Sequence, residues 1–497
     1  MNPYDELESR FARQGAIEEA IQFLHWDAAA MMPRGGAASR AGQLATLRVV
    51  AHEELTRPDM ADLLAAAEED AGNRLDQWQR ANLREMRRRW RHAAAVPADL
   101  VAALSEARSQ SEGDWRAARP ADDFAAALPG LERVLELTRE AAAAKAAALG
   151  TGPYEALLDQ YEPGGRVAEI DRLFADIEAF LPALLAAALE RQAARPAPPE
   201  PHGPFPPAAQ RRAARMLVER VGFDFAHGRL DESAHPFTGG TPDDVRLTTR
   251  YDAADPAKAL MAALHECGHG LYKRGLPATW RRQPVGAARG MAVHESQSLL
   301  VEMQMCRSRA FAGFAAPLLS EIFGGEATAW QPEALYRRQI RVRPGPIRVD
   351  ADEVTYPAHV ILRYRLERAM VAGDLLPRDL PAAFNDGLKA AIGVTPPSDR
   401  DGVLQDIHWY DGYWGYFPTY TLGAVIAAQL FAAARAALPG LDDAIGGGQF
   451  AALLGWLKRH IHEKGSLFAT GELIEAATGA PLAVAAFERH LRQRYLA

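Results

Sequence analysis

Cysteine is scarce in this chain, which has only Cys267 and Cys306 among its 497 residues. Small secreted proteins that depend on disulfides use cysteine far more densely, so a hydrophobic core must hold this fold together. Two thiols in a chain of this length suit a reducing compartment. We therefore expect a cytoplasmic protein.

Long apolar runs and a strong charge of one sign are also missing. The most apolar stretch near the C-terminus, residues 423–438, contains Gln429 and Arg435 and is shorter than the roughly 20 apolar residues of a transmembrane helix. The N-terminus MNPYDELESRFARQG is too polar for a secretory signal. A net charge of −8 gives no electrostatic reason to expect nucleic acid or a membrane as partner. We interpret the basic run at 84–92 as a solvated helix face.

Helical periodicity dominates the sequence, since apolar residues such as Leu100, Leu104 and Ala107 recur at three- and four-residue steps. Residues 243–252 alternate with period two instead, which predicts a β-strand. The fold class is therefore mainly α with a small sheet near the candidate site. We predict a single domain over 1–497, in which the proline-rich stretch 195–209 is a surface connection.

The chemistry is concentrated in one predicted helix, AKALMAALHECGHGLYKRG at 257–275. His265 and His269 lie one turn apart and project to the same side, so both imidazoles can bind one tetrahedral Zn²⁺. Glu266 is rotated about 100° from His265 and can take a proton from water beside the metal. Cys267 is rotated about 200° and should face the core. A helix with two hydrogen-bonded histidines is the alternative interpretation.

A catalytic zinc site needs a third protein ligand. Glu295 lies in the apolar stretch 291–305, which predicts a buried helix, and a buried carboxylate needs a partner. Zinc is one candidate partner and Arg289 is another. His294 is the rival ligand, but neighbouring helical positions diverge by about 100°, so only one of the two is expected to bind. We favour Glu295 because two histidines and a glutamate form a recurring catalytic set.

The chain resembles the carboxypeptidase Taq family of HEXXH zinc metallocarboxypeptidases from residue 25 to near its C-terminus. Several motifs occur in the order found in that family. They are HPF at 235–237, DVRLT at 244–248, HECGH at 265–269, HESQS at 294–298, IRVDADEVTYPAHVILRYRLE at 347–367, GVLQDIHW at 402–409 and GYFPTYTLG at 415–423.

The resemblance implies that His265, His269 and Glu295 bind the metal and that Glu266 is the catalytic base and acid. It also implies one large helical subunit with a deep groove that holds the metal, usually a homodimer, with cobalt accepted by some members in place of zinc. The chain departs from the family pattern after HESQS. There Glu302 is kept, but Met303 replaces an asparagine, which bears on substrate preference and on the dimer contact.

Peptide hydrolysis also needs a donor for the oxyanion of the tetrahedral intermediate. Tyr416, Tyr420 and His408 are candidates, and we prefer Tyr420. The alternative for all three is a purely structural role, in which the ring packs in the core and its polar atom is hydrogen-bonded within the protein.

An exopeptidase must also hold the terminal carboxylate of its substrate, and an arginine suits a carboxylate best because it can donate two parallel hydrogen bonds. Arg348 is the first candidate and Arg246 the second, and His235 is a further candidate for lining this pocket. Carboxylates such as Asp350 and Asp244 stand close in sequence, so structural salt bridges are the alternative.

These residues predict a zinc-dependent carboxypeptidase of broad specificity, acting on peptides with a free C-terminus. The first alternative is an HEXXH-plus-Glu oligoendopeptidase that cuts internal bonds of short peptides. The second is a non-enzymatic helical scaffold with a structural metal site, but such a site has no need of a base at Glu266.

Overall fold

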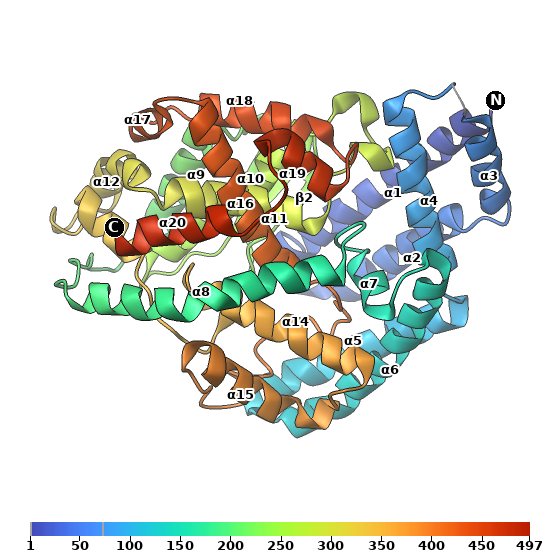
Figure 1. The fold of residues 1–497 in the computed structure, drawn as a ribbon, viewed down its shortest axis with the longest axis horizontal. Coiled ribbons are helices and arrows are strands. Elements are labelled where there is room, and N and C mark those ends of the chain that lie inside the picture. The colour runs from blue at the N-terminus through green and yellow to red at the C-terminus, as the bar shows by residue number, and fades with distance from the viewer. Residues whose placement is uncertain (1, 72–73) are drawn as a thin grey trace.

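The computed structural model describes residues 2–71 and 74–497. Helices dominate the chain, and the first half is almost entirely helical (Figure 1). Its helices are α1 (Pro3–Ala30), α2 (Ala37–Leu55), α3 (Met60–Asp70), α4 (Gln77–Ala94), α5 (Ala98–Ala121), α6 (Phe124–Leu149), α7 (Pro153–Leu158), α8 (Val167–Ala193) and α9 (Pro207–Val221).

The second half returns to helices after a short β segment. Its helices are α10 (Pro256–Gly275), α11 (Met291–Leu299), α12 (Arg309–Phe323), α13 (Pro332–Gln339), α14 (Tyr356–Ala372), α15 (Leu380–Ile392), α16 (Pro418–Ala437), α17 (Leu441–Gly446), α18 (Ala451–His460), α19 (Thr470–Thr478) and α20 (Ala485–Leu496). Figure 1 shows α1 to α4 on one side of the molecule and α12, α17 and α20 at the opposite end. The mainly α fold class is confirmed.

The small sheet lies against α10, next to the candidate site. Its order is β1 (Gly228–Glu232), β3 (Asp244–Thr249), β2 (Thr238–Thr241), with β1 parallel and β2 antiparallel to β3. β3 confirms the strand predicted within 243–252. Thr249 Oγ1 donates to the Ala259 carbonyl at 2.9 Å, which fixes the sheet to α10.

The predicted helix over 257–275 is confirmed as α10, whose first turn is capped by the Asp255 carboxylate accepting from Ala257 N at 2.9 Å. The predicted helix over 291–305 is confirmed only in part. α11 ends at Leu299, and Leu300–Cys306 form a π-helical segment. Residues 194–206 form the expected irregular connection, and α9 begins at Pro207, inside the proposed 195–209.

Two glycines allow α10, α11 and α16 to approach closely at the centre of the molecule. A Cβ on Gly268 of α10 would lie 2.5 Å from the Gln297 carbonyl of α11. A Cβ on Gly423 of α16 would lie 2.8 Å from Cβ and Cγ of Glu295. A larger side chain at either position would push the helices apart. The close approach places His265 and His269 opposite Glu295.

α16 is the one described helix that is long and apolar enough to cross a bilayer by length and composition. Its most apolar window is 61% buried inside the protein. The helix packs on α11 and α14 and contributes Leu422, Val425 and Ile426 to the main hydrophobic core. Its apolarity is that of a core helix.

Candidate functional site

His265, His269 and Glu295 come together in the structure, and their potential ligand atoms all lie within 4.8 Å of one another. Glu295 Oε2 is 3.4 Å from His269 Nε2 and 3.8 Å from His265 Nε2. Two ligands about 2.1 Å from a tetrahedral Zn²⁺ lie roughly 3.4 Å apart. The spacing of these donors therefore fits one such cation.

The second ring nitrogen of each histidine already has an acceptor. His265 Nδ1 lies 2.9 Å from Glu302 Oε2, and His269 Nδ1 lies 3.1 Å from the His294 carbonyl. Each Nδ1 therefore carries a proton and donates it, which leaves the Nε2 lone pair of each ring for a metal. Carboxylates and carbonyls orient metal-binding histidines in this way.

The electrostatics of the cluster favour a cation. Burial alone would lower the pKa of His265, but Glu295, Glu302 and Glu266 raise it to about 10, so at neutral pH this ring holds a second proton, on Nε2, which a bound metal would displace. Burial raises the pKa of Glu302, but Arg307 and His265 bring it down to about 2. The Glu302 carboxylate is therefore ionised, and burial raises the pKa of Glu295 less than the neighbouring histidines lower it, so both draw positive charge to the site and a divalent cation would satisfy this demand.

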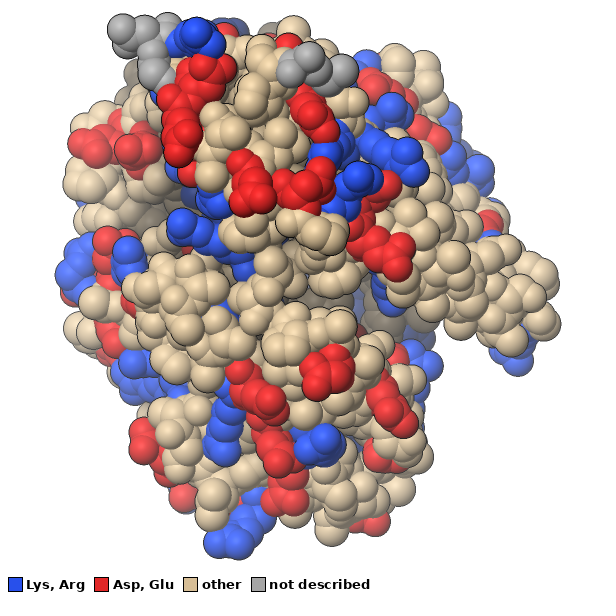
Figure 2. Space-filling view, turned by 90° about the vertical axis from the view of Figure 1, so that its right-hand side faces the viewer, with Lys and Arg blue, Asp and Glu red and all other residues tan. Residues whose placement is uncertain are grey.

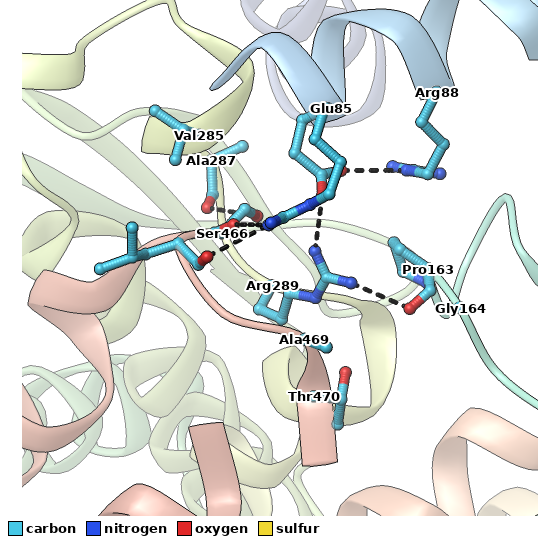
Figure 3. A network of polar contacts seen from close by, with 12 residues as sticks. Glu85, Arg88, Pro163, Gly164, Val285, Ala287, Arg289, Ser466, Ala469 and Thr470 are labelled. Atoms are coloured by element: carbon cyan, nitrogen blue, oxygen red, sulfur yellow. Dashed lines mark hydrogen bonds and ion pairs between the residues drawn. The ribbon is translucent and has the colours of Figure 1, made fainter. Parts of the chain in front are cut away.

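The two alternatives weighed for Glu295 are not what the structure shows. Arg289 pairs with Glu85 at 2.9 Å and donates to the Pro163 carbonyl at 2.9 Å, so it is not the partner of Glu295 (Figure 3). The His294 ring stacks on the His269 ring, with centroids 4.4 Å apart. Among the described residues, the three-residue cluster that could hold a metal contains Glu295 and not His294.

Glu266 is buried beside His265, and a threonine of the sheet holds its carboxylate. Thr238 Oγ1 in β2 lies 2.6 Å from Glu266 Oε2 and 3.0 Å from the Glu266 carbonyl. The hydroxyl donates to one carboxylate oxygen and leaves the other for a further proton or donor. Cys267 points into the core, as predicted, and both cysteines are free.

Tyr416, Tyr420 and His408 lie together on the α16 side of the site. The two tyrosine rings are 5.2 Å apart, and His408 Nε2 lies 3.2 Å from Tyr420 Oη. Burial raises the pKa of both tyrosines, and the Glu295 carboxylate raises it further. Burial lowers the pKa of His408 to about 4 despite the Asp406 carboxylate, so the imidazole is neutral at neutral pH.

Arg348 is buried, and its charge is paired with a residue far away in sequence. Its Nη2 and Nε lie 2.7 and 3.1 Å from Asp406 Oδ1, and Nη1 donates to Tyr356 Oη at 3.1 Å. The guanidinium also lies 5.1 Å from the centre of the Tyr420 ring. The neighbouring Asp350 contacts Lys258 instead, at 3.1 Å. Arg348 is thus a fixed cation beside the tyrosines, and its contact with substrate stays a prediction.

Arg246 and His235 lie on the sheet side. The Arg246 guanidinium forms two hydrogen bonds with Asp244, at 2.6 and 2.5 Å, and lies 4.3 Å from the centre of the Trp26 ring. The structural salt bridge weighed for Arg246 is therefore present. His235 is exposed, and its carbonyl accepts from Ser233 Oγ at 2.5 Å. A role for either residue in substrate binding stays a prediction.

Sequence reasoning gave no role to several residues that shape the site. Thr238 sits in the HPFTGG stretch, directly after the residues used as a motif, and nothing in the sequence links it to Glu266. Glu302 carried a usable signal, because an acidic residue in the apolar run LLVEMQM needs a buried partner. Its partners are His265 and Arg307, whose Nη2 lies 2.6 Å from Glu302 Oε1.

The comparisons with known proteins agree over nearly the whole chain. The family model for carboxypeptidase Taq (M32) metallopeptidase matches residues 6–495. The chain is 40% identical to thermostable carboxypeptidase 1 of Thermus thermophilus, with 95% of this chain and 94% of the relative covered. It is 32% identical to thermostable carboxypeptidase 1 of Pyrococcus furiosus, with 99% and 98% covered.

Solved structures show the same fold. Metallocarboxypeptidase 1 of Trypanosoma cruzi superimposes with a TM-score of 0.97 at 39% identity, and the match covers 99% of both chains. The sequence, the fold and the donor set at the centre of the molecule thus agree, and they exclude the non-enzymatic scaffold. The chain belongs to the carboxypeptidase Taq (M32) family of metallopeptidases and is a metallocarboxypeptidase.

Proposed function

We propose that this metallocarboxypeptidase uses Zn²⁺ held by His265, His269 and Glu295, with Co²⁺ as a functional substitute. The observation that carries the proposal is the pair of engaged Nδ1 atoms, because they fix both rings with Nε2 facing the Glu295 carboxylate, where a metal can take the place of a proton. When bound, zinc supplies Lewis-acid chemistry, which activates water and polarises a carbonyl.

Glu266 acts as the general base and then the general acid. It accepts a proton from the attacking water and delivers that proton to the leaving amine. Thr238 holds one oxygen of the Glu266 carboxylate at 2.6 Å, so the other oxygen is the one that exchanges the proton. A fixed orientation of the carboxylate is what proton transfer requires.

The tyrosine side of the site stabilises the reaction intermediate and holds the substrate. Tyr420 Oη donates to the oxyanion, while the neutral His408, 3.2 Å away, orients that hydroxyl. Tyr416 lines the substrate site beside it. Arg348 attracts the terminal carboxylate of the peptide, and Arg246 and His235 are the secondary candidates for this contact.

The remaining features of the proposal rest on the composition of the chain and, for the broad specificity and the homodimer, on its membership of the family. The enzyme releases C-terminal amino acids with broad specificity, acts in the cytoplasm, and works as a homodimer. It does not act on nucleic acid or at a membrane. One domain covers residues 1–497. The main hydrophobic core spans Ala118 to Tyr495, and the N-terminal helices, which have a small cluster of their own, are tied to the rest by the buried Glu85–Arg289 ion pair at 2.9 Å.

The test compares a peptide that has a free C-terminus with the same peptide amidated. We expect release of the C-terminal residue from the free peptide, no cleavage of the amidated one, loss of activity with a chelator, and recovery with zinc. Cleavage of both peptides at internal bonds would instead support the oligoendopeptidase. Activity that survives complete removal of metal would contradict the proposed site.

A further inference from the structure

A hollow of about 400 Å³ lies on α4, on the side of the molecule away from α12 and α20. Five arginines of this one helix line it, at spacings of four, three, one and three residues, which place them on one helical face. The remaining lining comes from the last residue of α6, from α3 and from one leucine of α4. The lining residues are Arg80, Arg84, Arg87, Arg88, Arg91, Leu149, Glu68 and Leu83.

Two of the five arginines are neutralised within the protein. Arg87 forms two hydrogen bonds with Glu68, at 2.8 and 2.7 Å. Arg88 lies 3.0 Å from the Glu85 carboxylate and 3.2 Å from Asp159. These ion pairs fix the two guanidinium groups in the wall of the hollow.

In the part of the chain that the structure describes, the other three arginines of the hollow, Arg80, Arg84 and Arg91, are not neutralised by ion pairs of this kind. Arg80 donates to the Leu75 carbonyl, and Arg84 donates to the carbonyls of Ser466 and Leu467 at 3.3 and 3.1 Å. A carbonyl accepts a hydrogen bond but carries no formal charge, so these contacts position the guanidinium groups without neutralising them.

The Glu85 carboxylate lies near Arg84 but is shared with other arginines. Glu85 lies 3.5 Å from Arg84, but it also pairs with Arg88 and Arg289. Arg91 is exposed and, within residues 2–71 and 74–497, has no acidic partner. Positive charge therefore exceeds negative charge in this hollow, although the whole chain has a net charge of −8.

We propose that the hollow is a binding site for a small anion carrying more than one phosphate group. A guanidinium donates two parallel hydrogen bonds to a phosphate and keeps its charge at every physiological pH. The volume lies in the range of about 300–1,000 Å³ that small-molecule sites occupy. Leu83 and Leu149 offer an apolar surface to the rest of such a ligand.

A long nucleic acid fits this surface poorly. Figure 2 views the side of the molecule on which α1 to α4 lie, and acidic side chains are interspersed there with the basic ones. A polyanion that extended beyond the hollow would meet these carboxylates. The site therefore suits a compact ligand.

Arg84 and Arg88 are unsuitable as test positions because each also links α4 to a distant part of the chain. Arg84 holds the chain at Ser466, and Arg88 shares Glu85 with Arg289, which lies just before α11. Changing them could alter the fold near Glu295. Arg80 and Arg91 lack such links to α11 among the described residues, so substitutions there test binding alone.

The experiment is calorimetric titration of the metal-containing protein with pyrophosphate and with orthophosphate. We expect saturable binding of pyrophosphate, about tenfold tighter than that of orthophosphate because it offers more oxygens to the arginines. R91Q and R80Q should each weaken binding about tenfold, and R91E should weaken it further. The control is R133Q on α6, which removes an exposed arginine paired with Glu136 and should leave the affinity unchanged.

Three results would overturn the proposal. The first is an absence of binding at millimolar pyrophosphate. The second is pyrophosphate binding whose affinity is the same in R91E and R80Q as in the unchanged protein. That result would indicate that pyrophosphate coordinates the catalytic metal instead of the arginines. The third is tighter binding of a short oligonucleotide than of pyrophosphate. Peptide hydrolysis is measured separately, so failure here leaves the proposed catalytic function untouched.

Discussion

Thr238 Oγ1 lies 2.6 Å from Glu266 Oε2, so a residue of the small sheet holds the carboxylate next to His265, the first of the proposed metal ligands. The sheet is fixed to α10 by Thr249, and β2 therefore has a defined position relative to the helix that carries Glu266. The sheet thus does more than cover the helix, because it orients the residue that we propose as the base.

Replacing Thr238 by valine keeps the shape of the side chain and removes the donor. We expect T238V to bind metal normally and to lower kcat about 10- to 100-fold with little change in KM, because the carboxylate loses its fixed orientation. T238S restores the hydroxyl and should recover most of the rate. An unchanged kcat in T238V would show that the hydrogen bond does not matter for catalysis.

Replacing Glu266 by glutamine tests the base itself. E266Q keeps the size of the side chain and leaves His265, His269 and Glu295 in place, so we expect one bound metal ion per chain. The rate should fall by about 10²- to 10⁴-fold, because glutamine cannot accept the proton of the attacking water. Metal content by atomic emission and residue release from a free-ended peptide provide the two readouts. Substantial remaining activity would assign the base to another residue.

Glu302 and Arg307 should control metal affinity without touching the metal. Glu302 accepts from His265 Nδ1 at 2.9 Å and is held by Arg307 at 2.6 Å. E302Q should lower metal affinity about 10- to 100-fold, as loss of a carboxylate behind a ligating histidine does. Competition with a chromogenic chelator measures the affinity. The matched control is E321Q, at an exposed position of α12, which should bind metal like the unchanged protein.

Glu367 should make stability depend on pH. Burial raises its pKa from 4.5 to about 8, although Tyr154 and Trp409 donate hydrogen bonds to its two oxygens. The unfolded chain ionises this group near its ordinary pKa, so between about pH 4.5 and 8 the folded state binds more protons. Its contribution to the free energy of unfolding is therefore present at low pH and is lost as the pH rises through this window.

The variant E367Q isolates that contribution because glutamine does not titrate. Relative to the unchanged protein, E367Q should gain about 4 kcal/mol in unfolding free energy between about pH 5 and pH 9. Denaturant titrations of both proteins at the two pH values give this difference, and hydrogen bonds lost at both pH values cancel. A pH-independent difference would mean that Glu367 ionises normally in the fold.

The features that were predicted best from the sequence depend on residues that are close together in the chain. The spacing of His265 and His269 on one helix, and the period-two pattern of β3, are short-range features, and the structure has both. The third metal ligand was harder to predict, because Glu295 and the neighbouring His294 were both candidates and the choice between them depended on packing. Gly268 and Gly423 decide that packing by letting three helices converge on Glu295.

Long-range partners could not be predicted from the sequence. Arg348 is close in sequence to Asp350 but pairs with Asp406, which is 58 residues away. The helix through 291–305 has regular apolar spacing, and nothing in it signalled the π-helical segment. In that segment the carbonyls of Met303 and Gln304 accept from Arg494 of α20. A side chain almost two hundred residues away therefore helps to satisfy the backbone there.

The most direct test of the central claim is anomalous diffraction at the zinc absorption edge from crystals of the zinc-loaded protein. The account predicts one strong peak per chain, within about 2.0–2.2 Å of His265 Nε2, His269 Nε2 and a Glu295 oxygen. Glu266 should lie beside this peak without coordinating it. A peak elsewhere, or a Glu295 side chain turned away from the peak, would contradict the proposed site.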